Sequence, residues 1–172
     1  SIIVKTAHSY QRMLDEVSLF LHLVEESKDA DGKKQSYKKL NLLNNILHNK
    51  KVLIVDDDVR NIYSLTKALE AFKMNVITAF DGNEAIKMLD EHPDTDIVLL
   101  DMMMPNMDGY ETAEKIRTKP KMLTLPLIAV TAKAMTGDRE KCIKAGASDY
   151  ITKPVDIDQL LSLLRVWLYD KV

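Results

Sequence analysis

Residues 51–58 read KVLIVDDD, a short apolar run that ends in three consecutive carboxylates. A run of this length, rich in β-branched residues and closed by Asp, is typical of a strand that is buried on both faces of a sheet. Four later runs have the same form. The sequence therefore predicts five buried strands, at Val52–Val55, Val76–Ala79, Ile97–Leu100, Leu127–Val130 and Tyr150–Thr152.

Amphipathic stretches separate these runs. Apolar residues recur at three- and four-residue intervals from Ile62 to Leu69, which is the period of a helix with one buried face. Further helices are predicted from Asp138 to Ala145 and from Asp156 onward. Strands that alternate with helices form a parallel sheet, because each helix carries the chain back to the start of the next strand. The pattern therefore predicts an α/β fold for residues 51–172.

Composition excludes several classes of protein. The chain has 172 residues, of which 46% are hydrophobic and 29% are charged, as is typical of a folded globular protein. Twenty-four Lys and Arg against 26 Asp and Glu give a net charge of −2, which argues against nucleic-acid binding by bulk charge. No apolar run in the sequence approaches the roughly 20 residues of a membrane span. The single cysteine, Cys142, excludes an internal disulfide and fits the reducing cytoplasm, where we expect the protein to act.

The first 50 residues differ in character from the rest. Residues 1–26 begin with a strand-like run, IIVKT, and continue with apolar side chains at helical spacing. Residues 27–50 form a polar linker that ends in a short helix. Because the opening run resembles residues 150–154, we expect residues 1–26 to be the last strand and helix of a preceding, truncated copy of the same domain.

Polar side chains follow four of the predicted strands at the point where each strand ends. In a parallel sheet the carboxyl ends of the strands meet at one edge, where ligands bind. These side chains are Asp56, Asp57 and Asp58 after the first strand, Asp101 after the third, Thr131 after the fourth and Lys153 after the fifth.

The chemistry of this set suits phosphoryl transfer. Neighbouring carboxylates raise each other's pKa unless a cation lies among them, and hard oxygen ligands favour Mg²⁺. The Mg²⁺ and Lys153 would neutralise a phosphoryl group, and the Thr131 hydroxyl would donate a hydrogen bond to it. A carboxylate beside the metal would then act as the nucleophile and form an acyl phosphate.

The same stretches carry a family resemblance that covers residues 51–172 in order and at matching spacing. They are KVLIVDDD at 51–58, IVLLDMMMPNMDG at 97–109, IAVTA at 128–132 and GASDYITKP at 146–154. The sequence resembles the receiver domain of two-component response regulators. This resemblance implies a flavodoxin-like sheet of order 2-1-3-4-5 with helices on both faces, here preceded by a helical N-terminal extension.

The resemblance also implies roles for the residues that match the family's motifs. Asp101 would be the phosphoacceptor, and Thr131 and Lys153 would contact the phosphoryl group. Tyr150 matches the aromatic residue that reorients with Thr131 on activation. The bond between Lys153 and Pro154 is expected to be cis.

The metal ligands implied by the resemblance are Asp56, Asp57, Asp101 and the backbone carbonyl of Met103, and the expected ion is Mg²⁺. Asp58 falls at a position that varies in the family, and we interpret it as charge at a helix N-terminus. We interpret Met102–Met104 as loop and packing residues rather than a soft-metal site, because the neighbouring ligands are hard oxygens.

Three functions compete on these residues. The first is a phosphorylation switch that receives its phosphoryl group from a histidine kinase or a histidine phosphotransfer domain. Met103 and Ala132 flank the approach of water and offer no acid or amide, so we expect slow self-dephosphorylation. The second is a phosphohydrolase with an Asp56-x-Asp58 nucleophile motif, which leaves the Asp101 segment unexplained. The third is a receiver-like module that docks without phosphorylation.

The context that we expect is the C-terminal receiver of a hybrid sensor histidine kinase, with a kinase core in the same full-length chain. The runner-up is a response regulator with two receiver modules. We expect no nucleic-acid partner and no membrane contact by these residues. The sequence leaves the oligomeric state open.

Overall fold

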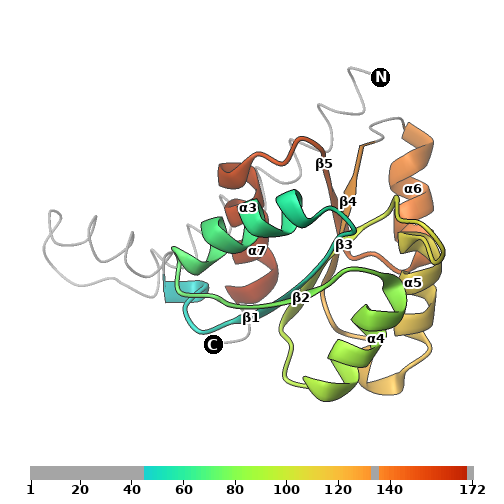
Figure 1. Cartoon of the computed structure of the whole chain (residues 1–172), viewed down its shortest axis with the longest axis horizontal. Coiled ribbons are helices and arrows are strands. Elements are labelled where there is room, and N and C mark those ends of the chain that lie inside the picture. The colour runs from blue at the N-terminus through green and yellow to red at the C-terminus, as the bar shows by residue number, and fades with distance from the viewer. Residues whose placement is uncertain (1–44, 133–135, 170–172) are drawn as a thin grey trace, which may run out of the picture. The chain divides into compact units, whose positions relative to one another are not determined.

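The computed structural model describes residues 45–132 and 136–169 (Figure 1). The strand and helix expected in residues 1–26, and the linker up to residue 44, lie outside the described residues. Asn45 and Ile46 are helical, and the rest of the short helix predicted before the sheet lies outside the described residues.

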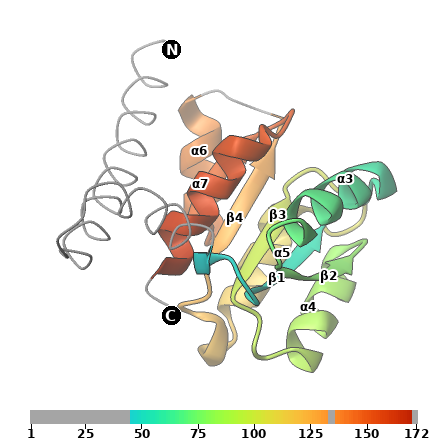
Figure 2. The same ribbon diagram turned by 90° about the vertical axis from the view of Figure 1, so that its left-hand side faces the viewer.

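A five-stranded parallel sheet forms the centre of the compact unit that spans residues 49–157. Its order, β2-β1-β3-β4-β5, confirms the prediction. Figure 2 labels four of these strands, β2, β1, β3 and β4. Each strand contains its predicted run and is one residue longer at one end. The strands are β1 (Lys51–Val55), β2 (Asn75–Ala79), β3 (Ile97–Asp101), β4 (Leu127–Thr131) and β5 (Asp149–Thr152).

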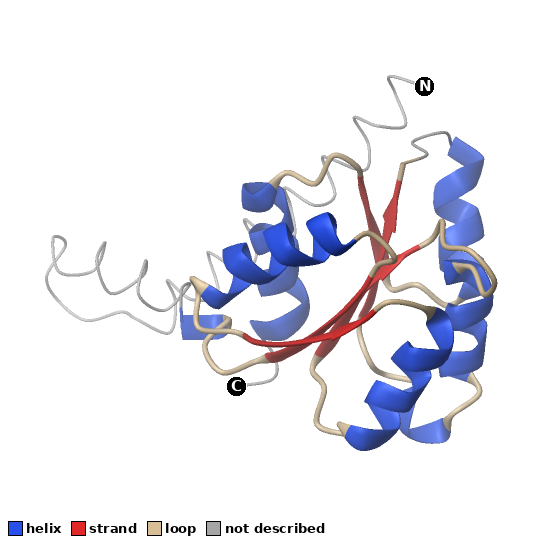
Figure 3. Ribbon diagram, viewed as in Figure 1, coloured by secondary structure: helices blue, strands red, loops and turns tan. Residues whose placement is uncertain are grey.

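Helices lie on both faces of this sheet, as the fold class predicts. In Figures 1 and 3, α3 lies on one side and α4, α5 and α6 lie on the other. The elements of this unit are α3 (Val59–Glu70), α4 (Gly82–Glu91), α5 (Gly109–Arg117), the short 3-10 helix η1 (Pro120–Met122) and α6 (Thr136–Ala145). The helix α6 begins two residues before the predicted Asp138.

The last helix, α7 (Ile157–Leu168), begins one residue after the predicted Asp156. Residues 158–169 fall in a second compact unit with residues 45–48. Within α7, Leu160, Leu164 and Leu168 are buried and lie at helical spacing on one face. None of the helices described here is long and apolar enough to cross a membrane.

Aspartate side chains cap three helices at the edge of the sheet where the site lies. Asp58 accepts a hydrogen bond from the backbone N–H of Arg60 at the start of α3. Asp81 and Asp108 cap α4 and α5 in the same way. An N-cap of this kind satisfies a backbone N–H that has no partner within the helix. The caps therefore fix the loops that follow β1, β2 and β3.

The strands β3 and β4 are buried along their whole length, because successive side chains point to opposite faces of the sheet and helices cover both. Leu53, Val55 and Leu100 belong to a buried cluster that also includes side chains of α4, α5 and α6. Cys142 of α6 lies in this cluster and is fully buried, so it packs in the core. On the other face, α3 contacts β1 and β2 and buries Leu69 completely.

Arg117 at the end of α5 joins segments that are distant in sequence. Its Nε donates to the carbonyl of Gly146 at 2.8 Å, and its guanidinium also donates to the carbonyl of Met122 and to the hydroxyl of Ser148. Gly146 has a φ of 118°, which favours glycine. Arg117 therefore holds η1 and the loop after α6 against the end of α5.

Gly109 allows the loop after β3 to approach the start of α5 closely. A Cβ atom at this position would lie 2.4 Å from the Cα of Met102 and 2.5 Å from the carbonyl oxygen of Asp101. Both of these atoms belong to the backbone, so they cannot move aside as a flexible side chain does. A larger residue at position 109 would displace the end of β3, where Asp101 lies, and the loop that follows it.

Candidate functional site

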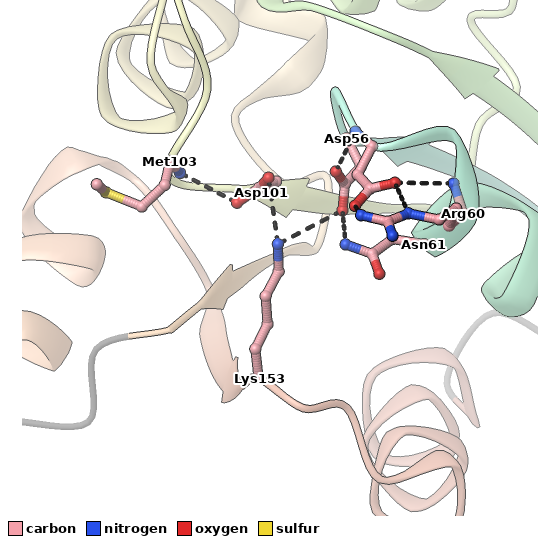
Figure 4. Close-up of polar contacts among 7 residues, drawn as sticks. Asp56, Arg60, Asn61, Asp101, Met103 and Lys153 are labelled. Carbon is pink, nitrogen blue, oxygen red and sulfur yellow. Dashed lines mark hydrogen bonds and ion pairs between the residues drawn. The ribbon is translucent and has the colours of Figure 1, made fainter.

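Three carboxylates meet where the first and third strands end (Figure 4). Asp56 follows β1 directly and Asp101 is the last residue of β3. One carboxylate oxygen from each of Asp56, Asp57 and Asp101 lies within 4.8 Å of the other two. The strands β1 and β3 are hydrogen-bonded neighbours, so residues 45 positions apart in the chain form one acidic cluster.

The two buried carboxylates of this cluster are held by backbone amides. Asp56 and Asp101 are each 3% exposed, whereas Asp57 is exposed. The backbone N–H of Asp58 donates to Asp56 Oδ1 at 2.8 Å, and that of Met103 donates to Asp101 Oδ1 at 3.0 Å. Hydrogen bonds from backbone N–H groups fix a carboxylate in one orientation and offset the cost of burying it.

Lys153 places an ammonium group between these carboxylates. Its Nζ lies 3.3 Å from Asp101 Oδ2 and 3.6 Å from Asp56 Oδ2. Its backbone N–H donates to the carbonyl of Thr131 at 2.8 Å, which ties the segment after β5 to the end of β4. The peptide bond between Lys153 and Pro154 is cis, as predicted. Figure 4 shows the side chain extending from this segment to both carboxylates.

Burial raises the pKa of Asp101 to about 6, and the neighbouring Asp56 carboxylate adds to the rise. The backbone amide of Met103 and the ammonium of Lys153 oppose it, because both favour the ionised form. Burial has the larger effect. An additional positive charge in the site would therefore stabilise the ionised form of Asp101 and lower its pKa.

The donor set fits Mg²⁺. Three carboxylates supply hard oxygen atoms close together, and two of them are buried on a rigid sheet edge, which is the ligand type that Mg²⁺ prefers. The backbone amide of Met103 holds its loop against Asp101. Coordination by the Met103 carbonyl stays a prediction.

The predicted switch residues lie on neighbouring strands. Thr131 ends β4 and is 1% exposed. Tyr150 lies in β5, opposite Ala129, and its partly buried ring packs against the core cluster. Reorientation of either residue stays a prediction.

Asp58 lies at the N-terminus of α3 and is not part of the acidic cluster, as the sequence predicted. Its carboxylate receives hydrogen bonds from the Arg60 backbone and guanidinium at 2.9 to 3.2 Å. These hydrogen bonds lower the pKa of Asp58. Asp58 therefore caps α3, and its backbone N–H orients Asp56.

Sequence reasoning missed Asn61 and an adjoining pocket. Asn61 lies in the first turn of α3, and its side-chain amide donates to Asp56 Oδ2 at 3.3 Å. A pocket of about 510 Å³ adjoins the site, and Asp56, Asn61 and Lys153 line it together with apolar side chains such as Leu65 and Val155. No spacing in the sequence marks Asn61, because its role depends on the angle at which α3 leaves β1.

The family model of the response regulator receiver domain matches residues 52–165. The chain belongs to this family. The receiver assignment agrees with the order of the strands and with the acidic edge described above. It also confirms the family predicted from the four motifs.

Curated relatives include receiver-containing proteins of bacteria and fungi. The signal transduction histidine-protein kinase BarA of Escherichia coli is 38% identical over 113 residues, which are 66% of this chain and 12% of that protein. Two-component system protein A of Emericella nidulans is 40% identical over 127 residues, or 73% of this chain and 18% of that protein. This receiver chain spans between 12% and 25% of the length of such relatives.

A solved receiver structure extends the comparison to three dimensions. The receiver domain of the sensor histidine kinase PA1611 from Pseudomonas aeruginosa is 31% identical, with a TM-score of 0.65. The match covers 70% of this chain and 98% of that one, and that structure holds a magnesium ion coordinated in its active site cleft.

Proposed function

We propose that this receiver domain accepts a phosphoryl group on Asp101 from a phosphohistidine. A carboxylate oxygen of Asp101 attacks the phosphorus atom, the P–N bond to the histidine breaks, and the imidazole leaves with a proton. The observation that carries the proposal is the geometry around Asp101, a buried carboxylate with Lys153 at 3.3 Å and two further carboxylates within 4.8 Å. Such a cluster concentrates charge of both signs around one nucleophile.

Lys153 and Thr131 are the residues proposed to bind the phosphoryl oxygens. The Lys153 ammonium already faces Asp101 Oδ2, so it lies beside any group attached to that oxygen. Thr131 ends the strand that pairs with β3 and carries a hydroxyl that can donate a hydrogen bond. Fixed donors of this kind stabilise the charge that develops during phosphoryl transfer.

Mg²⁺ is the proposed cofactor, held by Asp56, Asp57, Asp101 and the backbone carbonyl of Met103. When bound, it supplies positive charge that offsets the negative charge of the carboxylates and the phosphoryl oxygens. The buried position of Asp56 and its amide hydrogen bond hold one ligand in place before the metal arrives. The magnesium-containing receiver of PA1611 supports this assignment.

The proposed output is a change in conformation that alters partner binding. Thr131 would move toward the acyl phosphate, and Tyr150 would turn inward. Thr131 and Tyr150 lie on β4 and β5, which are hydrogen-bonded neighbours, so a movement of one would occur beside the strand that carries the other.

The proposed partner is a histidine kinase or a histidine phosphotransfer domain in the cytoplasm. The match to BarA, whose name describes a signal transduction histidine-protein kinase, supports a hybrid kinase as the full-length context. In that arrangement the kinase core lies in the same polypeptide. We expect no nucleic-acid partner for this domain.

Intact mass spectrometry tests the proposal. The chain is incubated with acetyl phosphate and Mg²⁺, and we expect one phosphoryl adduct per molecule. The adduct should be absent in Asp101→Asn and present in Asp58→Asn, a matched change at a carboxylate that caps α3. Phosphorylation of Asp101→Asn to the wild-type level would refute the assignment of the phosphoacceptor.

The same experiment separates the competing functions. Multiple turnover of the phosphodonor that depends on Asp56 would favour the phosphohydrolase. The engagement of the Asp58 carboxylate by Arg60 argues against that reading, because it occupies the second acid of the motif. A separate measurement adds Mg²⁺ and beryllofluoride, a mimic of the phosphoryl group, and records the spectrum of the protein. If that spectrum does not change, docking without phosphorylation is favoured.

A further inference from the structure

The loop after β3 contains four methionines within six residues, Met102, Met103, Met104 and Met107. Phosphoryl transfer gives these side chains no role. Three of them are buried, at 0%, 8% and 6% exposure, and Met103 alone among the four is 52% exposed. Of the four methionine side chains in this loop, that of Met103 is therefore the one exposed to solvent.

The remaining described methionines are also protected. Met74 and Met122 are 3% and 6% exposed, and Met88 is partly buried against the core cluster. Oxidation of methionine follows the exposure of its sulfur. Among the methionines of residues 45–132 and 136–169, an oxidant in solution therefore reaches Met103 first.

Met103 also lies at the rim of the phosphoryl site. Its backbone N–H donates to Asp101 Oδ1, and Figure 4 shows its side chain extending away from that carboxylate. Asp101 itself is only 3% exposed. A histidine on another protein must reach below the surface to meet Asp101, so the surface around that histidine comes to cover Met103.

We propose that Met103 is an oxidation site, and that its sulfoxide slows phosphoryl transfer from a protein donor to Asp101. The oxidant is a peroxide. The sulfur lone pair attacks one peroxide oxygen, the O–O bond breaks, an S–O bond forms, and a proton transfer releases water or an alcohol. The sulfur loses two electrons and the peroxide gains them. The effect on transfer rests on the function proposed for Asp101.

The greater polarity of the oxidised Met103 side chain explains why phosphoryl transfer from a protein donor would slow. A thioether is apolar and can be covered at little cost, whereas a sulfoxide oxygen is hydrated and loses water when a donor covers it. Because a polar group that is covered without a new hydrogen bond weakens docking, we expect the sulfoxide to slow transfer from a protein donor about tenfold. A small phosphodonor such as acetyl phosphate enters the site without covering Met103, so its rate should stay within about twofold.

The first experiment maps the oxidation. The full chain is treated with increasing hydrogen peroxide, and peptide mass spectrometry follows the addition of one oxygen to each methionine. We expect Met103 to be oxidised ahead of the other six described methionines. Oxidation of Met102, Met104 or Met107 at the same rate as Met103 would overturn the proposal.

The second experiment measures transfer. The donor is an isolated, radiolabelled histidine phosphotransfer domain chosen because it phosphorylates the untreated chain. Each protein is compared with its own untreated sample. We expect peroxide to slow transfer to the wild type about tenfold and to leave the rate of Met103→Leu unchanged, because leucine is apolar and cannot be oxidised. A permanently polar Met103→Gln should be slow with the protein donor before any treatment.

The outcomes separate this proposal from the function on which it rests. Equal slowing of the wild type and Met103→Leu would overturn the role of Met103 while leaving Asp101 as the phosphoacceptor. Slowing with acetyl phosphate to the same extent as with the protein donor would also overturn it, since the effect would then not come from docking. Phosphorylation of Asp101→Asn would instead refute the proposed function itself.

Discussion

Asp101→Asn should stabilise the metal-free protein at neutral pH. The Asp101 carboxyl has a pKa of about 6 in the folded chain against 3.8 for the unperturbed group. The folded state therefore binds this proton more tightly than the unfolded state does. The contribution of Asp101 to stability falls as the pH rises from about 4 through 6, and above that range both states are ionised and the full penalty of burying the charge remains.

The magnitude follows from the size of the shift. One pKa unit corresponds to about 1.4 kcal/mol, so the penalty is about 3 kcal/mol as an upper value. Asparagine is neutral and has nearly the same shape, and its carbonyl can accept the hydrogen bond that Met103 donates to Asp101 Oδ1. The substitution also removes one of the two carboxylates that face Lys153, which reduces the gain. We expect Asp101→Asn to unfold with a free energy about 1 to 3 kcal/mol higher than the wild type at pH 8.

Urea denaturation between pH 4 and pH 8, in the presence of EDTA, measures this difference. The gain should shrink to below about 1 kcal/mol near pH 4, where Asp101 is protonated in the folded state and about half protonated in the unfolded state. Asp57→Asn is the matched control, because Asp57 belongs to the same cluster but is exposed, and it should change stability little. A gain that is independent of pH, or a loss of stability at pH 8, would refute the reasoning that burial raises this pKa.

Three further predictions concern stability. Gly109→Ala should destabilise the fold by about 2 kcal/mol or more, because the added Cβ would meet backbone atoms. Gly137→Ala should be neutral or stabilising, because no atom lies within 4 Å of a Cβ at that position. Urea denaturation compares the two variants, and equal effects would contradict the argument. Arg117→Met should cost about 2 to 3 kcal/mol in the same assay, because it leaves the partly buried carbonyls of Gly146 and Met122 without their donor. The matched change at exposed Lys87, Lys87→Met, should cost no more than about 0.5 kcal/mol. Mg²⁺ should raise the melting temperature of the wild type in a thermal scan and raise that of Asp101→Asn less, since a ligand that binds the folded state stabilises it; an equal rise in both would argue against Asp101 as a ligand.

The strands were predictable because their interiors consist of apolar side chains. The same criterion missed the ends. Lys51, Asn75 and Asp149 are polar or charged, yet each begins a strand and pairs with a neighbouring strand through its backbone. Backbone pairing depends on the neighbouring strand and leaves no mark in hydropathy. The early start of α6 at Thr136 has the same origin, because the periodic pattern does not mark the first turn of this helix.

The acidic cluster was predictable for a topological reason. Residues at the carboxyl ends of adjacent parallel strands meet whatever their separation in sequence, so the sequence alone places Asp56 beside Asp101. Asn61 and Arg117 could not be found in this way. Their partners are set by the direction in which α3 and α5 leave the sheet, and by side-chain rotamers that packing decides.

Lys153 gives the domain a counterion of its own. Because its ammonium already lies between two buried carboxylates, the resting site does not depend wholly on ions from solution to balance its charge. The same ammonium lies on the side of Asp101 where a phosphoryl group would be attached. On the proposed function, one tethered cation thus serves the acidic cluster before transfer and the phosphate oxygens after it, and it changes partners by rotations of a single side chain.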